Sequence, residues 1–143
     1  MKQAKMINRL IGIKQRAADA AETAHVAAHH KAAGAEQTLK QAVAGWKSFT
    51  EEHSDIRSVS DLEDRDRQYK WLRKVITDAE KDVAIARNDE ASKREQMTEA
   101  RVELRRYETW LENTQELARI EQGRAQRGAD DEIAARKNRA SNG

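Results

Sequence analysis

The chain lacks cysteine and proline altogether and contains little glycine. Among its 143 residues there are no Cys, no Pro and only 6 Gly. Without cysteine it cannot form a disulfide framework or a thiolate metal site. Without proline, and with so few glycines, it also lacks the turn residues that strand-rich folds need at regular intervals. These absences exclude all-β and α/β folds.

Large apolar side chains are also scarce. Aromatic residues make up 4% of the chain and hydrophobic residues 38%, against 36% charged residues. The longest apolar run, Leu10 to Ile13, is far shorter than the roughly 18 residues of a membrane span. A compact enzyme with a water-excluding pocket needs a thicker core than this composition provides. We therefore expect a protein with no membrane span, no catalytic activity and no cofactor.

The apolar and small residues that are present recur at helical spacing in two long segments. In the second segment, steps of three and four residues alternate regularly, which is typical of a coiled coil. In the first segment an eleven-residue rhythm mixes with a seven-residue rhythm. The stripe expected in the first segment comprises Met6, Leu10, Ile13, Ala17, Ala21, Ala24, Ala28, Ala32, Ala35, Leu39, Ala42, Trp46 and Phe49. The stripe expected in the second comprises Tyr69, Leu72, Ile76, Ala79, Val83, Ala86, Glu90, Lys93, Met97, Ala100, Leu104, Tyr107, Leu111, Thr114 and Ala118.

Between these segments, the stretch TEEHSDIRSVS (residues 50–60) interrupts the rhythm and predicts a turn. Ser60 and Glu63 have the spacing of a capping box, which predicts that the second helix starts there. The sequence therefore predicts an all-α fold, a long antiparallel two-helix coiled-coil hairpin whose second helix is longer than the first. We expect a single domain (1–143), with helix 1 at about 5–50, a turn at about 51–60, helix 2 at about 61–125 and a frayed tail to 143.

Folding the chain symmetrically about residue 55 predicts which residues face each other. Glu90 and Lys93 then lie opposite roughly Ala21 and Ala18. Because these alanines are small, we expect the two charged side chains to reach past them into water.

The charges are distributed unevenly along the chain. Residues 1–18 contain only basic charges, and residues 50–66 contain seven acids beside Arg57 and Arg65. Such an arrangement orients the encounter with a partner protein. The basic residues among positions 1–18 are Lys2, Lys5, Arg9, Lys14 and Arg16.

Few residue groups point to chemistry. His25 and His29 have the spacing of two metal ligands on a helix, but no third ligand is evident, so we expect no metal site. Aromatic residues gather near the turn, where Trp71 and Val75 fall just off the expected stripe. They predict either ordinary packing or an exposed apolar strip that contacts a partner. Trp110 lies near the start of helix 1 in the hairpin, and it predicts either packing over the open end of the hairpin or contact with a partner.

The start of the chain resembles a known family. The segment MINRLIGIK (residues 6–14), followed by Ala21 and Glu22, is similar to the opening of the YscO family of type III secretion proteins. The second half, with Trp110, Arg119, Arg124 and an acidic group at residues 130–132, is similar to the flagellar relative FliJ.

This resemblance implies a stalk protein of a bacterial type III export apparatus, in the cytoplasm and peripheral at the inner membrane. The end with both termini would enter the hexameric export ATPase, and the opposite part would contact the cytoplasmic ring of the export gate. Export chaperones are implied as further partners, without a site. By position, the ATPase-binding residues would be Arg9, Leu10, Lys14, Arg16, Trp110, Arg119 and Arg124. The gate-binding residues would be Tyr69, Trp71, Leu72 and Val75.

Two other classes of function remain open. A nucleic-acid-binding protein would use the arginine-rich termini, but the near balance of 27 basic and 25 acidic residues argues against it. A generic coiled-coil scaffold would pair two chains through the heptads, or would place the first helix on a membrane through Met6, Leu10 and Ile11.

We predict that the isolated chain is a monomer, because each apolar stripe finds its partner within the same chain. Small-angle scattering at several concentrations measures this. We expect the apparent mass to stay constant on dilution, whereas a scaffold made of paired chains would dissociate and lose mass.

Overall fold

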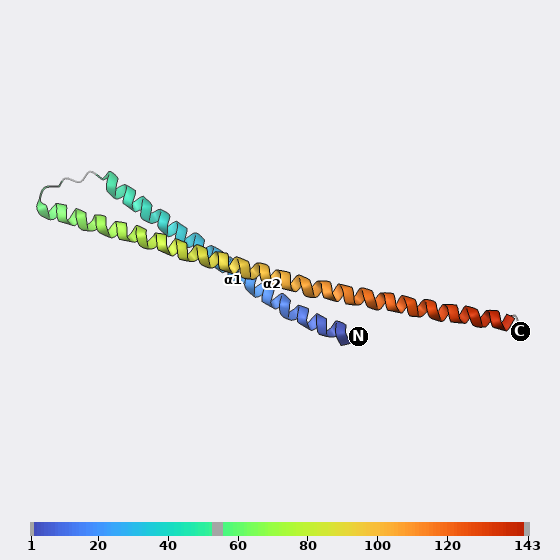
Figure 1. Ribbon diagram of the computed structural model, residues 1–143. Helices are drawn as coiled ribbons and strands as arrows, with labels where there is room; N and C mark the ends of the chain where they lie inside the picture. Colours follow the sequence, from blue (N-terminus) through green and yellow to red (C-terminus); the bar gives the residue numbers. More distant parts are fainter. Residues whose placement is uncertain (1, 53–55, 142–143) are drawn as a thin grey trace. The chain divides into compact units, whose positions relative to one another are not determined.

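The described part of the protein forms two long helices. The structure, a computed structural model, describes residues 2–52 and 56–141. Helix α1 spans Lys2–Glu51 and helix α2 spans Val59–Ser141. The two helices pack against each other as a hairpin in which α2 is the longer (Figure 1). The predicted all-α hairpin is therefore confirmed, and none of the described residues lies in a strand.

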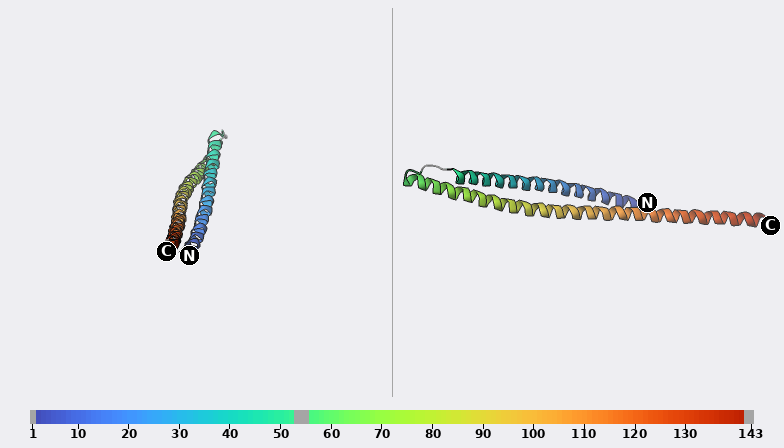
Figure 2. Two further views of the ribbon diagram at one scale, coloured as in Figure 1. Left: turned by 90° about the vertical axis from the view of Figure 1, so that its right-hand side faces the viewer. Right: turned by 90° about the horizontal axis from the view of Figure 1, so that it is seen from above.

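The chain divides into two compact units, and each contains a piece of both helices. The terminal unit comprises Met1–Ala18 and Ala100–Gly143, and the middle unit comprises Asp19–Glu99. Within each unit a segment of α1 runs alongside a segment of α2 (Figure 2). The expectation of a single domain stays a prediction.

Both helices follow from local preferences of the sequence. Alanine, glutamate, lysine, arginine and glutamine favour helices, and no proline interrupts either segment. In α2, Asp61 in the first turn and Arg139 in the last turn complement the helix dipole. The first turn of α1 has no acidic residue. In the described part of the chain, neither helix is long and apolar enough to cross a membrane.

The N-terminal cap of α2 lies two residues earlier than predicted, at Ser58 instead of Ser60. The backbone amide of Asp61 donates a hydrogen bond to Oγ of Ser58 (3.1 Å). The Asp61 carboxylate in turn accepts a hydrogen bond from the backbone amide of Arg57 (3.1 Å). The proposed capping box at Ser60 and Glu63 is therefore wrong. Ser58 and Asp61 have the same three-residue spacing, and this earlier pair forms the cap.

The other helix boundaries also differ from the prediction. Helix α1 begins at Lys2, earlier than expected, and ends at Glu51. The predicted end of α2 near residue 125, with a frayed tail beyond it, is wrong, because α2 continues to Ser141. Its final part has only exposed side chains beyond Gly123. Helix-favouring residues and short-range ion pairs such as Arg136–Glu132 (2.9 Å) support it locally.

The buried stripe of α1 is a regular heptad along its whole length, and the predicted stripe is one residue out of place before Ala21 and again at Ala24, where His25 belongs to the seam. Ile7 and Ala18 are buried, whereas Met6 and Ile13 are about half exposed (48% and 53%). The mixed eleven-residue rhythm is therefore wrong. It arose because two positions of the true stripe carry polar side chains, which hid the regular spacing. The seam of α1 comprises Ala4, Ile7, Ile11, Lys14, Ala18, Ala21, His25, Ala28, Ala32, Ala35, Leu39, Ala42, Trp46 and Phe49.

The predicted stripe of α2 matches the residues that are shielded from water, except at its first position. Ala79, Ala86 and Glu90 are buried, and the others are half-buried, whereas Tyr69 is just over one third exposed. Several of these seam residues are alanines, which allow the two helix backbones to approach closely.

The register between the helices differs from a fold that is symmetric about residue 55. Glu90 contacts His29, about two turns along α1 from the predicted Ala21. Near the connection, Arg65 donates a hydrogen bond to the backbone carbonyl of Glu52 (3.2 Å). Helix α2 therefore meets the end of α1 only after its own first turns. This offset changes which residues of α1 and α2 face each other in the middle unit.

Replacing Ser58 with alanine should lower the free energy of unfolding by about 1 kcal/mol, because the amide of Asp61 loses its acceptor. Urea denaturation followed by circular dichroism measures the change. Ser60→Ala is the matched control, since Ser60 lies inside the helix, where alanine is preferred. A loss for Ser60→Ala as large as that for Ser58→Ala would contradict the assignment of the cap.

Candidate interaction surfaces

The seven residues that the family resemblance assigns to ATPase binding all lie in the terminal unit. Arg9 and Arg16 are exposed on α1, and Arg119 and Arg124 are exposed on α2. Leu10 is half-buried, and Trp110 remains 38% exposed. The fold therefore brings these residues, far apart in the sequence, into one compact unit.

Lys14 differs from the other predicted binding residues because it belongs to the seam. Its ammonium group lies 3.6 Å from Oε1 of Glu103. The same group lies over the ring of Tyr107, 5.4 Å from the ring centroid. Tyr107 in turn packs beside Trp110, with ring centroids 5.9 Å apart. Lys14 thus joins the two helices, which the sequence analysis missed; a lysine at a heptad position was the available signal.

Some cations of this unit are paired with an acid, and others are not paired in the part of the chain that the structure describes. On α2, Arg119 is paired with Glu116 (2.8 Å) and Arg136 with Glu132 (2.9 Å). On α1, Lys2, Lys5, Arg9 and Arg16 have no acidic partner within the described residues. Because α1 has no acid before Asp19, this end of the helix carries an uncompensated positive charge.

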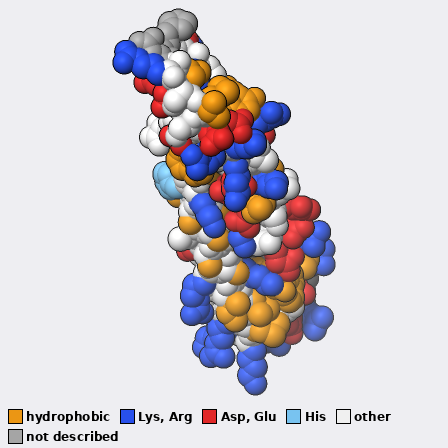
Figure 3. Space-filling view, turned by 90° about the vertical axis from the view of Figure 1, so that its left-hand side faces the viewer, with side chains coloured by type: hydrophobic (Ala, Val, Ile, Leu, Met, Phe, Trp, Pro, Cys, Tyr) orange, Lys and Arg blue, Asp and Glu red, His pale blue; other side chains and the backbone are white. Residues whose placement is uncertain are grey.

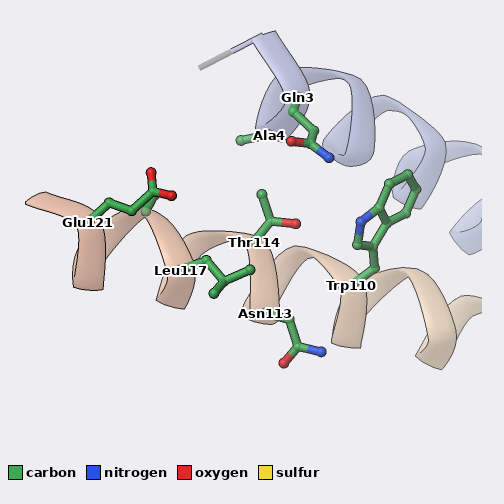
Figure 4. A pocket seen from close by; sticks show the side chains of 8 residues that line it. Gln3, Ala4, Trp110, Asn113, Thr114, Leu117 and Glu121 are labelled. Atoms are coloured by element: carbon green, nitrogen blue, oxygen red, sulfur yellow. The ribbon is translucent and has the colours of Figure 1, made fainter.

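A groove of about 410 Å³ lies where the start of α1 meets α2 (Figure 4). Gln3 and Ala4 border it on α1, and the indole of Trp110 faces them from α2 (Figure 4). Leu117 lies on the α2 side and is 62% exposed. The lining residues are Gln3, Ala4, Trp110, Asn113, Thr114, Leu117, Ala118 and Glu121.

The four residues assigned to gate binding lie together near the start of α2, in the middle unit. Trp71 is 62% exposed, whereas Leu72 and Val75 are half-buried. Tyr69 packs against Trp46 of α1, with ring centroids 4.7 Å apart. The strip is therefore divided: Trp71 is free to contact a partner, and Tyr69 helps to hold the two helices together.

A second groove lies close to this strip. It has a volume of about 410 Å³ and is bordered by Phe49 and Thr50 of α1 and by Leu62, Asp66 and Tyr69 of α2, with Arg65 completing its lining. The guanidinium group of Arg65 lies over the Phe49 ring, 5.1 Å from its centroid. Phe49 is buried by this contact and by the neighbouring side chains.

The middle unit contains a buried carboxylate that the sequence analysis misinterpreted. Glu90 is only 4% exposed, so the expectation that it reaches past small residues into water is wrong. Nδ1 of His29 lies 2.7 Å from its Oε1, and Nη1 of Arg87 donates to its Oε2 (2.5 Å). Arg94 contributes a longer hydrogen bond (3.4 Å). A seam carboxylate requires such partners, because burying an unpaired charge is very unfavourable.

This cluster joins the two helices through charge. Nε of Arg87 also donates to Glu36 of α1 (2.7 Å), so Arg87 bridges one carboxylate from each helix. Hydrogen bonds from His29 first, and then from Arg87, lower the pKa of Glu90 to about 2. Glu36, followed by Glu90, raises the pKa of Arg87. The carboxylate is thus held in its charged form at neutral pH.

The two histidines considered as metal ligands serve different roles. His29 is engaged by Glu90, and Nε2 of His25, a seam residue, is buried without a hydrogen-bond partner among the described residues. Within that part of the chain, no group of three or more His, Cys, Asp or Glu side chains is placed to hold a metal ion.

Comparisons with known proteins do not identify the chain: no family model, no curated protein and no solved structure matches it. The resemblance to the YscO and FliJ proteins therefore stays a prediction, as do the absence of catalysis and the partners that the resemblance implies.

Replacing Glu90 with glutamine should destabilise the hairpin at neutral pH, because His29 and Arg87 lose their carboxylate. The pKa of Glu90 lies below its ordinary value, so protonation favours the unfolded chain. The stability that Glu90 supplies is therefore complete above about pH 4.5 and declines as the pH falls towards about 2. The variant should show a smaller loss of melting temperature over this range than the parent protein.

Circular dichroism melts at a series of pH values measure this difference. Glu95→Gln is the matched control, because Glu95 is exposed on the same helix segment. Equal pH profiles for the parent protein and Glu90→Gln would show that Glu90 contributes no pH-dependent stability.

Proposed function

We propose that the chain is a non-enzymatic stalk subunit of a bacterial type III protein export apparatus. In this proposal the terminal unit binds the hexameric export ATPase, and the start of α2 contacts the cytoplasmic ring of the export gate. The protein would act in the cytoplasm, peripheral to the inner membrane. It would bias the conformation of the hexamer without carrying out chemistry.

The observation that carries the proposal is that all seven residues assigned to ATPase contact lie in one compact unit. They come from the start of α1 and from the later part of α2, more than 90 positions apart between Arg16 and Trp110. Arg9 and Arg16 have no acidic partner among the described residues and are exposed. Unpaired cations on a helix surface favour contact with carboxylates of a partner.

A contact with nucleic acid has less support. Arg119 and Arg136, two of the arginines that would contact phosphates, are paired with Glu116 and Glu132. Interleaved acids would repel phosphates along this part of α2.

One observation favours a coiled-coil scaffold as the second candidate. Beyond Gly123, α2 remains helical to Ser141 while all its described side chains are exposed. Ile133 is 54% exposed there, so this stretch has an apolar side chain that another helix could cover. A scaffold would use this stretch to bind a second chain.

The proposal is tested by measuring the hydrolysis rate of the cognate hexameric export ATPase with and without this protein, at low and at physiological salt. We expect stimulation. Reversing the charge of Arg9 and Arg16 together to glutamate should weaken the apparent affinity about tenfold, because two exposed cations become repulsive. Lys14 is left unchanged, since its contact with Glu103 supports the hairpin.

The matched control is Lys137→Glu/Arg139→Glu, which changes the net charge equally on the same unit but away from the start of α1. Helical content is compared by circular dichroism. Absence of stimulation at both salt concentrations, or an equal effect of the control, would overturn the assigned ATPase contact.

A further inference from the structure

Helix α1 carries a second apolar stripe that α2 does not cover. Met6, Leu10, Ile13 and Ala17 follow one another at steps of four, three and four residues, so they share one face of the helix. Ile7, Ile11, Lys14 and Ala18 of the seam have equivalent spacing one residue further along, which places the seam about 100° around the helix. The first segment of α1, residues 2–18, is therefore apolar on two faces, and α2 covers only one of them.

The accessibility of the side chains agrees with this geometry. Met6 is 48% exposed and Ile13 is 53% exposed, whereas Ile7 is fully buried. Leu10 is half-buried and Ala17 is exposed. We call Met6, Leu10, Ile13 and Ala17 the uncovered stripe. It is the set of residues that the sequence alone assigned to the helix–helix contact.

A row of cations borders the uncovered stripe on the side away from the seam. Lys2, Arg9 and Arg16 repeat every seven residues along one line of the helix, and Lys5 lies beside them. Lys2, Arg9 and Arg16 are each three or four positions from an apolar residue of the stripe, the spacing at which helix side chains are neighbours. Lys2, Lys5, Arg9, Met6 and Leu10 together line a groove of about 390 Å³. Figure 3 shows hydrophobic side chains beside Lys and Arg side chains at the lower end of the face in view.

These four cations, the basic row, have no compensating charge of their own. None of them has an acidic partner within the described residues, and α1 contains no acid before Asp19. A helix with an apolar stripe next to a continuous row of unpaired Lys and Arg fits the surface of an anionic bilayer. The cations meet the lipid phosphates there, while the apolar side chains enter the boundary between headgroups and acyl chains.

We propose that the first segment of α1 docks on an anionic lipid surface through the uncovered stripe and the basic row. A lipid surface fits better than a folded protein, because the stripe is linear and offers one open groove instead of a pocket for a particular side chain. Helix α2 packs on the other apolar face, the seam, and leaves Met6 and Ile13 about half exposed. This proposal does not depend on the proposed function.

The experiment is co-sedimentation of the full chain with sucrose-loaded vesicles. One set consists of phosphatidylcholine alone, and the other is an equimolar mixture of phosphatidylcholine and phosphatidylglycerol. We expect binding to the anionic vesicles only, and weaker binding as salt increases, because the attraction is partly electrostatic.

Two double variants separate the apolar and the charged contributions. Met6→Gln/Ile13→Gln should weaken binding about tenfold, because two side chains no longer enter the bilayer boundary. Lys2→Gln/Lys5→Gln should weaken it about fivefold for each cation removed. All four residues are exposed, so both variants should keep the helical content of the parent protein. If one variant loses helix, the other still decides the question.

Matched controls come from the same unit. Ile120→Gln/Ile133→Gln removes two exposed apolar side chains of α2, and Lys137→Gln/Arg139→Gln removes two exposed cations. Neither should change vesicle binding. No binding to anionic vesicles, no effect of the variants, or an equal effect of the controls would overturn the proposal.

The result is separable from the test of the proposed function. Vesicle binding is measured without the ATPase, and ATPase stimulation is measured without lipid. The two vesicle variants leave Arg9 and Arg16 intact. If Met6→Gln/Ile13→Gln abolishes ATPase stimulation and the parent protein does not bind vesicles, the stripe contacts protein, and the lipid proposal is wrong while the proposed function stands.

Discussion

In the described structure each helix of this chain has one partner helix, and most other features depend on that constraint. A helix with a single partner shields one narrow stripe, so the core is a line of seam residues instead of a three-dimensional interior. Only a few side chains are buried, and many of those are alanines, such as Ala28 and Ala32 of α1. Every other face of both helices is left to water or to partners. A chain with 36% charged residues satisfies this arrangement, whereas a compact fold would not tolerate it.

Small seam residues bring the helices close together but specify their alignment weakly, because one alanine fits as well as the next. The charged contacts supply the missing specificity. In the middle unit, Glu90 accepts hydrogen bonds from His29 of α1 and from Arg87, which also binds Glu36. In the terminal unit, Lys14 pairs with Glu103 across the seam. A shift of one heptad would separate the buried Glu90 carboxylate from His29 and Arg87 from Glu36, a larger penalty than misaligning alanines. We infer that these polar seam residues align the two helices in their respective units.

The same constraint explains why the candidate contact surfaces lie where they do. In the terminal unit, Lys2, Lys5, Arg9 and Arg16 of α1 have no acidic partner among the described residues, and the apolar side chains of Met6 and Ile13 are not covered by α2. In the middle unit, Trp71 projects from α2 with most of its surface exposed, while neighbouring Tyr69 packs on Trp46. Both surfaces combine large side chains with charged neighbours, which are basic in the first and of both signs in the second. Surfaces of this kind contribute binding and orientation, which agrees with the stalk role proposed above.

The sequence by itself determined the fold class, the regular seam of α2 and the position of the connection. The absence of proline and the presence of sustained heptads are local properties of the sequence, so they can be recognised without a structure. It did not determine the seam of α1, because Met6, Leu10 and Ile13 have the same helical spacing as Ile7, Ile11 and Lys14. The register between the helices was also undetermined. The sequence does not specify the residue about which the chain folds back, and the alanine-rich stripes fit several alignments. Tertiary structure decided both. Contact with α2 selects which apolar face of α1 is shielded, and the observed register places His29 of α1 on the Glu90 carboxylate, which Arg87 of the same helix also binds.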